Sequence, residues 1–174
     1  MRTLADRLAR GDDSAFAELY DACADRLYRF AAARLGSADA AADVVQTAFM
    51  RAVKSRRKFR RVENPTAYMF QIVRNEVVRA ASVPGWKAEH ASAEGLAANA
   101  SDDRADDAEA LAAALQRLDD DDREIVELKS YSGLTFAEIA ELTQRPPGTV
   151  ATRYRRALES LRGWLAKEFS RERT

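Results

Sequence analysis

Apolar residues recur every three or four positions through most of the chain, and short polar stretches interrupt them. At about 100° per residue, this spacing gathers the apolar side chains on one face of a helix. Residues 14–35 carry such a face, formed by Phe16, Leu19, Tyr20, Cys23, Leu27 and Phe30. The same pattern predicts helices over residues 1–10, 39–54 and 65–81, and four more within residues 107–174, the last ending near Phe169. We therefore expect an all-α protein.

Residues with special backbone preferences mark where several of these helices begin. Asn64 is expected to cap the helix that follows it, with Pro65 in the first turn. Thr135 and Glu138 have the spacing of a capping box. Pro147 suits the first position of the last helix, where its missing N–H is harmless. The short turn between these last two helices predicts a helix-turn-helix.

Residues 83–106 break the apolar pattern and are rich in Ala, Ser and Asp. Charge also divides there: residues 1–82 hold 15 Lys and Arg against 10 Asp and Glu, residues 83–110 hold 2 against 7, and residues 111–174 hold 11 of each. We expect a helical domain over residues 1–82, a flexible acidic linker over residues 83–106, and a second helical domain containing the helix-turn-helix over residues 107–174.

The composition excludes several kinds of site. A single cysteine, Cys23, rules out an internal disulfide and a cysteine-rich zinc site, and its place on an apolar face predicts a buried structural thiol. The single histidine, His90, has no obvious partner, so we predict no metal or catalytic role for it. No apolar run approaches the ~20 residues that span a bilayer, and the N-terminus lacks a signal-peptide core. The expected location is the cytoplasm.

Basic residues are dense in Arg51–Arg61, where seven of eleven residues are Lys or Arg and Phe59 lies among them. A solvated charge run is the ordinary interpretation, yet such a cluster is costly in a small domain unless it meets a polyanion. An aromatic residue within it can stack on an unpaired base. The next helix carries a polar face that can stack on bases, bind their edges and neutralise phosphate: Tyr68, Gln71, Arg74 and Asn75, with Arg79 one turn further.

The last helix carries Thr149, Thr152, Arg153 and Arg156 at helical spacing, away from its apolar stripe. A short helix, a tight turn and a second helix with an outward Thr and Arg face form the geometry that enters a DNA major groove. Helical hairpins with solvated arginines are also common in all-α proteins, so this pattern alone leaves both interpretations open.

Taken together, these motifs resemble one family. Phe16, Leu19 and Tyr20 match its opening pattern, Asp43 to Phe49 match its polymerase-binding helix, and Tyr68 to Asn75 match its promoter-melting helix. The second half matches through Arg123, Gly133, Glu138-Ile139-Ala140, Gly148-Thr149-Val150, Arg153, Arg156-Ala157-Leu158 and Leu161-Arg162. In this order and at these separations, the chain resembles a bacterial RNA polymerase sigma factor of the extracytoplasmic-function class, from about Asp13 to Phe169.

The resemblance implies a dissociable sigma factor and not an enzyme, without a cofactor or metal. Its implied partners are core RNA polymerase, promoter DNA as duplex and melted strand, and an anti-sigma factor. The implied polymerase-binding residues are Asp39, Asp43, Gln46, Phe49 and Met50. The implied contacts to the melted minus-10 element are Lys58, Phe59, Arg60, Arg61, Asn64, Tyr68, Gln71, Arg74, Asn75 and Arg79. The implied contacts to the minus-35 duplex are Arg145, Thr149, Thr152, Arg153, Arg155 and Arg156.

Two rival functions remain at this stage. A helix-turn-helix regulator would bind an operator without polymerase, tightly and usually as a dimer on paired half-sites. A helical adaptor would use the basic segment to bind an acidic protein and would show no salt-sensitive binding to nucleic acid.

Overall fold

A computed structural model describes residues 3–84 and 105–171, and every element in these residues is helical. The chain divides into two compact units, residues 1–91 and 92–174. The expected all-α fold of two helical domains, the second with a helix-turn-helix, is therefore confirmed. The domain limits given above stay predictions, and Trp86 and His90 lie outside the described residues.

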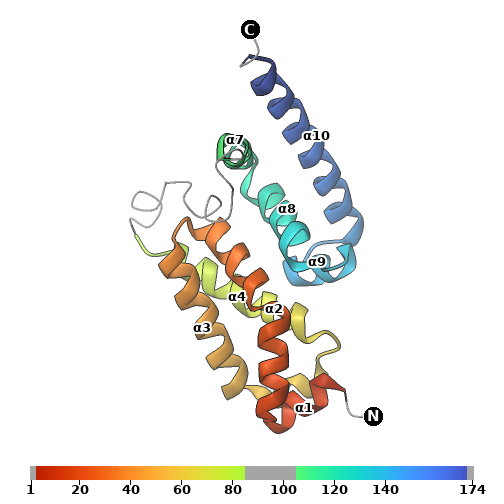
Figure 1. Cartoon of the computed structure of the whole chain (residues 1–174). Coiled ribbons are helices and arrows are strands. Elements are labelled where there is room, and N and C mark those ends of the chain that lie inside the picture. The colour runs from red at the N-terminus through yellow and green to blue at the C-terminus, as the bar shows by residue number, and fades with distance from the viewer. Residues whose placement is uncertain (1–2, 85–104, 172–174) are drawn as a thin grey trace. The chain divides into compact units, whose positions relative to one another are not determined.

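The first unit is built on three long helices that pack against one another in pairs. A short first helix lies against a 3-10 helix that connects the second and third long helices (Figure 1). Its elements are α1 (Leu4–Arg10), α2 (Asp13–Leu35), α3 (Ala38–Lys54), η1 (Arg56–Arg61) and α4 (Pro65–Ala81). The core comes from the apolar faces of these helices: Leu19, Leu27 and Phe30 of α2, Ala41 and Ala48 of α3, and Met69, Phe70 and Val73 of α4 are all fully buried.

Local capping explains where the helices of this unit start and stop. The Asn64 side chain accepts hydrogen bonds from the N–H groups of Thr66 and Ala67, and Pro65 occupies the first turn of α4, as predicted. At the other end of α2, Gly36 adopts φ 65°, and its N–H donates to the Ala32 carbonyl. Glycine adopts this left-handed conformation without a steric penalty, so it is the usual residue at such a helix end.

The thiol of Cys23 is buried in α2 and donates to the Leu19 carbonyl at 3.0 Å. Burial raises the pKa of Cys23 to about 11. The predicted structural thiol is therefore confirmed, since a protonated, buried thiol is unreactive at neutral pH.

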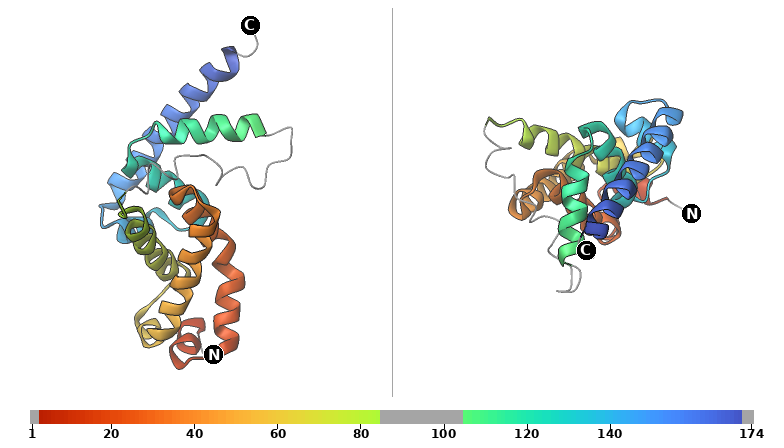
Figure 2. Two further views of the ribbon diagram at one scale, coloured as in Figure 1. Left: turned by 90° about the vertical axis from the view of Figure 1, so that its left-hand side faces the viewer. Right: turned by 90° about the horizontal axis from the view of Figure 1, so that it is seen from above.

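In the second unit, α10 (Pro147–Arg171) packs against the three other helices, α7 (Ala105–Gln116), α8 (Asp120–Ser132) and α9 (Phe136–Thr143). Figure 2 shows α10 as a single long rod that begins near α9. Ala157 and Leu161 on its apolar stripe close a small core with Leu115 and Val126.

The turn between α9 and α10 has the geometry of a helix-turn-helix. Thr135 and Glu138 form the predicted capping box, which fixes the start of α9. Gln144 ends α9 in the left-handed region, with φ 56°, and the Arg145 N–H donates to the Ala140 carbonyl at 2.9 Å. Pro147 then begins α10, as the sequence predicted.

Candidate nucleic-acid and partner-binding surfaces

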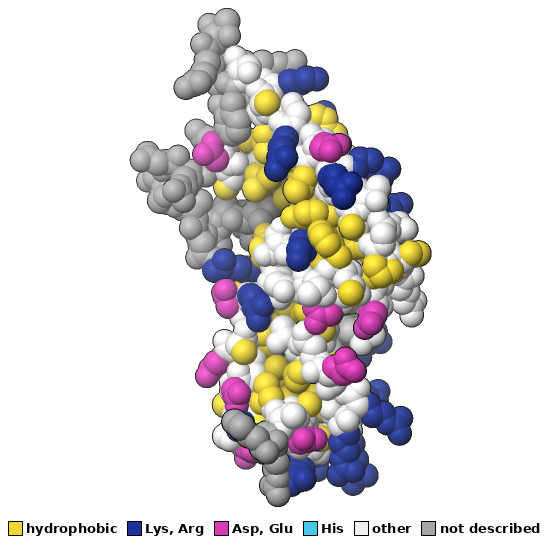
Figure 3. Space-filling model, turned by 90° about the vertical axis from the view of Figure 1, so that its right-hand side faces the viewer, with side chains coloured by type: hydrophobic (Ala, Val, Ile, Leu, Met, Phe, Trp, Pro, Cys, Tyr) yellow, Lys and Arg dark blue, Asp and Glu magenta, His cyan; other side chains and the backbone are white. Residues whose placement is uncertain are grey.

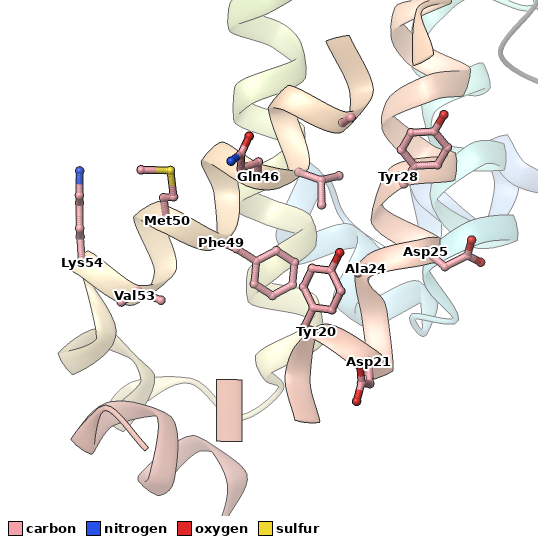
Figure 4. A pocket seen from close by; sticks show the side chains of 12 residues that line it. Tyr20, Asp21, Ala24, Asp25, Tyr28, Gln46, Phe49, Met50, Val53 and Lys54 are labelled. Atoms are coloured by element: carbon pink, nitrogen blue, oxygen red, sulfur yellow. The ribbon is translucent and has the colours of Figure 1, made fainter. Parts of the chain in front are cut away.

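An open apolar groove of about 1040 Å³ runs between α2 and α3 (Figure 4). Its apolar wall is formed by side chains that the rest of the described chain leaves uncovered: Tyr20 is 54% exposed, Met50 53% and Val53 44%. The Tyr20 ring lies across the groove against Phe49, with 5.0 Å between ring centroids. Large uncovered apolar side chains in one groove are typical of a surface that another protein covers.

Polar groups surround this apolar wall. Asp21 and Asp25 line the groove from α2, and Gln46 and Lys54 line it from α3. A groove with this lining fits the apolar side of a helix whose flanks carry cations and amides. We name this surface the α2–α3 groove.

Three of the five predicted polymerase-binding residues line the α2–α3 groove: Gln46, Phe49 and Met50. Asp39 and Asp43 are exposed on α3 but are not among its lining residues. Sequence reasoning missed Tyr20, which it placed on the buried face of its helix. No local signal in the sequence marks Tyr20 as exposed, because its exposure depends on how α2 packs against α3.

The basic segment Arg51–Arg61 comprises the last turn of α3 and the 3-10 helix η1. The five cations of η1, Arg56, Arg57, Lys58, Arg60 and Arg61, are all exposed. None of the five forms an ion pair with a carboxylate among the described residues. Figure 3 shows Lys and Arg side chains gathered at the end of the first unit where α1 and η1 lie. We call Arg56, Arg57, Lys58, Arg60 and Arg61 the η1 cations.

The sequence offered Phe59 as an aromatic residue that can stack on an unpaired base, but the structure buries it. Its side chain is 0% exposed, and its ring lies edge-on to Phe16 at 6.1 Å and to Tyr68 at 5.1 Å between centroids. The 3-10 helix places its one aromatic residue inward while the neighbouring cations stay in solvent. Burying such a side chain stabilises the fold by about 1.5–3 kcal/mol. Phe59 therefore anchors η1.

The predicted polar face of α4 is partly accessible. Gln71, Asn75 and Arg79 are exposed, while Tyr68 and Arg74 are half-buried. Asn64 uses its side-chain oxygen to cap α4, so that oxygen is not available to a base.

Arg79 lies at the end of a three-residue ion-pair network on this face. The Glu76 carboxylate has 8% of its side chain exposed and contacts Arg51 of α3 at 2.6 Å and Arg79 at 3.3 Å. Glu76 thus joins α3 to α4, and 62% of the Arg79 side chain remains open to solvent.

The second unit places its predicted duplex-binding residues on the turn and the start of α10. Thr149, Thr152, Arg155 and Arg156 are exposed, and Arg145 and Arg153 are half-buried. We call Thr149, Thr152, Arg153 and Arg156 the recognition face. The sequence pattern placed all four away from packing, but two of its arginines contact α8.

Carboxylates at the start of α8 hold these arginines. Arg153 Nη1 lies 2.7 Å from Asp122 Oδ1, and Arg156 Nη2 lies 2.8 Å from Asp122 Oδ2. Arg145 contacts Asp121 at 2.6 Å. Burial raises the pKa of Asp122, but the hydrogen bonds from Arg156 and Arg153 outweigh it and lower the pKa below its usual value. The expected free Arg face is therefore corrected to a paired one.

Among the described residues, no helix is both long and apolar enough to cross a bilayer. The same residues contain no cluster of His, Cys, Asp and Glu arranged to hold a metal ion.

Two family models match the chain in order: "Sigma-70 region 2" over residues 19–83 and "Sigma-70, region 4" over residues 108–161. The RNA polymerase sigma factor CarQ of Myxococcus xanthus is 30% identical over 166 residues, which cover 93% of this chain and 95% of the relative. The ECF RNA polymerase sigma factor BldN of Streptomyces coelicolor is 29% identical over 92% of this chain, which spans 64% of that longer relative.

A solved structure of similar fold is the sigma factor RpoE of Bartonella quintana in complex with the anti-sigma factor NepR. It is 26% identical, with a TM-score of 0.66, and the match covers 88% of this chain and 96% of that one. The first-unit match contains α3, η1 and α4, and the second-unit match contains α8, α9 and the start of α10.

Proposed function

The chain belongs to the sigma-70 family, within its extracytoplasmic-function class, and we propose that it acts as a dissociable specificity subunit of RNA polymerase. In this role it binds the core enzyme and directs promoter recognition and DNA melting. The observation that carries the proposal is the combination, in one chain, of an uncovered apolar groove in the region 2 match with cationic surfaces in both matched regions. An operator-binding regulator needs no such groove.

We assign core binding to the α2–α3 groove. The partner surface is a polymerase helix whose apolar side covers Tyr20, Phe49 and Met50. Gln46 and Lys54 then meet its polar flanks, while the acidic Asp21 and Asp25 favour a cationic partner. Asp39 and Asp43, exposed on the same helix, extend this surface beyond the groove.

Contacts to the melted minus-10 element are assigned to the η1 cations and to α4. Lys58, Arg60 and Arg61 neutralise phosphates without base preference, because flexible exposed cations bind the backbone rather than a base edge. Gln71, Asn75 and Arg79 have exposed amide and guanidinium groups for base edges, and Tyr68 and Arg74 border them. Phe59 has no direct DNA role in this assignment.

Contacts to the minus-35 duplex are assigned to the second unit. Thr149, Thr152, Arg153 and Arg156 enter the major groove, because a threonine and arginine face on the second helix of a helix-turn-helix is suited to base edges. Arg145 and Arg155 bind the flanking phosphates.

The polymerase supplies the chemistry of transcription, so the proposal gives the chain no catalytic residue and no cofactor. Because its partner works on chromosomal DNA, the proposed location is the cytoplasm. An anti-sigma factor is the proposed regulator, by analogy with the complex formed by RpoE and NepR. Such a partner would act by covering the α2–α3 groove.

The test compares two matched substitutions of exposed apolar residues near the end of a helix. Met50→Glu places a charge in the α2–α3 groove and is expected to weaken binding to core polymerase at least tenfold, or about 1.4 kcal/mol. Val78→Glu alters a residue of α4 that is 54% exposed and outside the groove, and it should bind like the wild type. Affinity is measured by fluorescence polarisation of the labelled full chain.

The proposal fails if the wild-type protein does not bind core polymerase. Tight binding of the protein alone to duplex DNA, together with that failure, would instead identify an operator-binding regulator. Equal losses in the Met50 and Val78 variants would reject the groove as the docking site.

A further inference from the structure

Asp122 is a buried carboxylate that joins two arginines of the recognition face. It lies in the first turn of α8, where the Asp119 side chain caps its N–H at 2.8 Å. Only 6% of its side chain is exposed, and each of its two oxygens accepts a hydrogen bond from a different guanidinium. The two partners, Arg153 and Arg156, are 31 and 34 residues away along the chain.

The neighbouring carboxylates contact the same region in a different way. Asp119 and Asp121 have 59% and 47% of their side chains exposed, and they lie 3.5 and 3.8 Å from Arg153. Pairs this open are screened by water and salt and add little order. Asp122 is therefore the group in α8 that fixes where these guanidinium groups lie.

A guanidinium has five N–H donors, and Asp122 uses one donor from each arginine. Asp122 leaves the other donors of each guanidinium unused. Fixing a long side chain before binding removes part of the entropy loss that binding otherwise incurs. It also sets the angle from which a planar fork approaches a base, and the selectivity of a bidentate contact depends on that angle.

We infer that Asp122 is a positioning residue for promoter discrimination, acting through Arg153 and Arg156, which it aligns for reading base edges. This inference rests on the proposed function, because it concerns the minus-35 contact of a sigma factor. Asp122 itself lies behind the recognition face and does not touch DNA. It sets the preference for the correct sequence over other sequences, and adds nothing to the general affinity for DNA.

Asp122→Asn separates alignment from charge attraction. Asparagine has nearly the same shape, but it keeps an acceptor for only one guanidinium and places an NH₂ donor against the other. The variant also removes a negative charge near DNA, so its general affinity for DNA should rise slightly in a salt-dependent manner. A loss of discrimination alongside unchanged or higher general affinity is a result that a merely structural role would not give.

The experiment uses holoenzyme assembled from core polymerase and the full chain. A duplex library with a randomised upstream element is selected with the wild-type holoenzyme, and binding of the selected element is compared with a scrambled element. Asp122→Asn is expected to lower this specificity ratio about tenfold. Asp122→Glu, which restores a carboxylate, should recover most of the ratio. Asp122→Ser also suits a helix start, and we expect it to lower the ratio as much as Asp122→Asn does. It serves as the test variant if Asp122→Asn does not fold.

Glu127→Gln is the matched control. Glu127 is a second buried carboxylate of α8, with 2% of its side chain exposed, and it pairs with Arg123 of its own helix at 2.7 Å. Its loss should lower stability but leave the specificity ratio unchanged. The inference would be overturned if Asp122→Asn kept the wild-type specificity ratio, or if Glu127→Gln lowered the ratio as much as Asp122→Asn does. Either result would leave the proposed function standing. A wild-type holoenzyme with no preference for any upstream element would overturn the proposed promoter recognition itself.

Discussion

The two cationic surfaces of this protein hold their arginines in opposite ways. In the first unit, the η1 cations extend into solvent from a helix held by a single buried aromatic, Phe59. In the second unit, Arg145, Arg153 and Arg156 are paired with carboxylates at the start of α8. Exposed cations suit a flexible, melted strand, which offers phosphates in many geometries. Paired and aligned arginines suit a duplex, whose base edges have fixed positions.

This difference implies that the two surfaces bind DNA with different dependence on salt and on geometry. Unpaired cations release counterions when they meet phosphates, so their contribution falls steeply with salt. Arginines that already have carboxylate partners change their electrostatic surroundings less on binding, so their contribution depends more on geometry. The zero formal net charge of the chain hides this division, because the balanced charges are unevenly distributed.

The largest expected effect comes from the anchor beneath the η1 cations. Phe59→Ala should reduce the free energy of unfolding by about 3–5 kcal/mol, because it empties a fully enclosed aromatic site between Phe16 and Tyr68. Urea unfolding of the full chain measures this change. Phe59→Leu refills most of the volume and should lose less than about 1.5 kcal/mol. A stable Leu variant that no longer binds forked promoter DNA would show that Phe59 contacts a base.

The next largest effect concerns the η1 cations themselves. Replacing Lys58, Arg60 and Arg61 by Gln should weaken binding of the holoenzyme to forked DNA roughly hundredfold at 0.1 M salt, and lower the slope of log affinity against log salt by about 2. A double variant of the second unit, Arg153→Gln with Arg156→Gln, should change the slope less for each charge removed. Titrating both variants over a range of salt concentrations measures the two slopes. Equal slope changes for each charge removed would contradict the proposed difference between the two cationic surfaces.

A smaller effect is expected from a single arginine of the recognition face. Arg153→Ala should weaken discrimination of the upstream duplex element by ~1–3 kcal/mol and leave binding to core polymerase intact. Arg162→Ala, an exposed arginine further along α10, is the control and should behave like the wild type. An equal loss of core binding in the Arg153 variant would contradict its assignment to DNA.

The smallest expected effect is a pH dependence of the free energy of unfolding, caused by the pairing of Asp122 with Arg153 and Arg156. The folded-state pKa of Asp122 lies below its usual value of 3.8. Its stabilising contribution is therefore fully present above pH 3.8 and is lost as pH falls through the lowered folded-state pKa. Urea unfolding at pH 5 and pH 3 should show a smaller drop for Asp122→Asn than for the wild type. An identical drop would mean that the pairing does not stabilise the fold.

Local features of this fold were predictable from sequence, and the errors concern contacts made across it. The caps at Asn64 and Thr135 depend on residues two or three positions away, so the sequence alone located them. The burial of Phe59 depends on Phe16, 43 positions earlier in the sequence numbering. A cationic neighbourhood in the sequence gave no sign of that contact.

The same difference between local and long-range contacts applies to the candidate site. Helical spacing identified the recognition face as a set, but not its pairing with Asp122, because that contact joins residues 31 and 34 positions apart. The apolar stripe of α2 was correct as a stripe. Whether its Tyr20 edge is covered depends on how α2 packs against α3, a tertiary property.

Transcription in vitro tests the central claim most directly. Core polymerase is incubated with fragmented genomic DNA of the source organism, with and without the protein, and the 5′ ends of the transcripts are sequenced. Start sites that appear only with the protein, preceded by two shared elements at a fixed separation, are the predicted result. The Met50→Glu variant should abolish most of these transcripts. If no protein-dependent start site appears while the protein alone binds duplex DNA tightly, the account is contradicted.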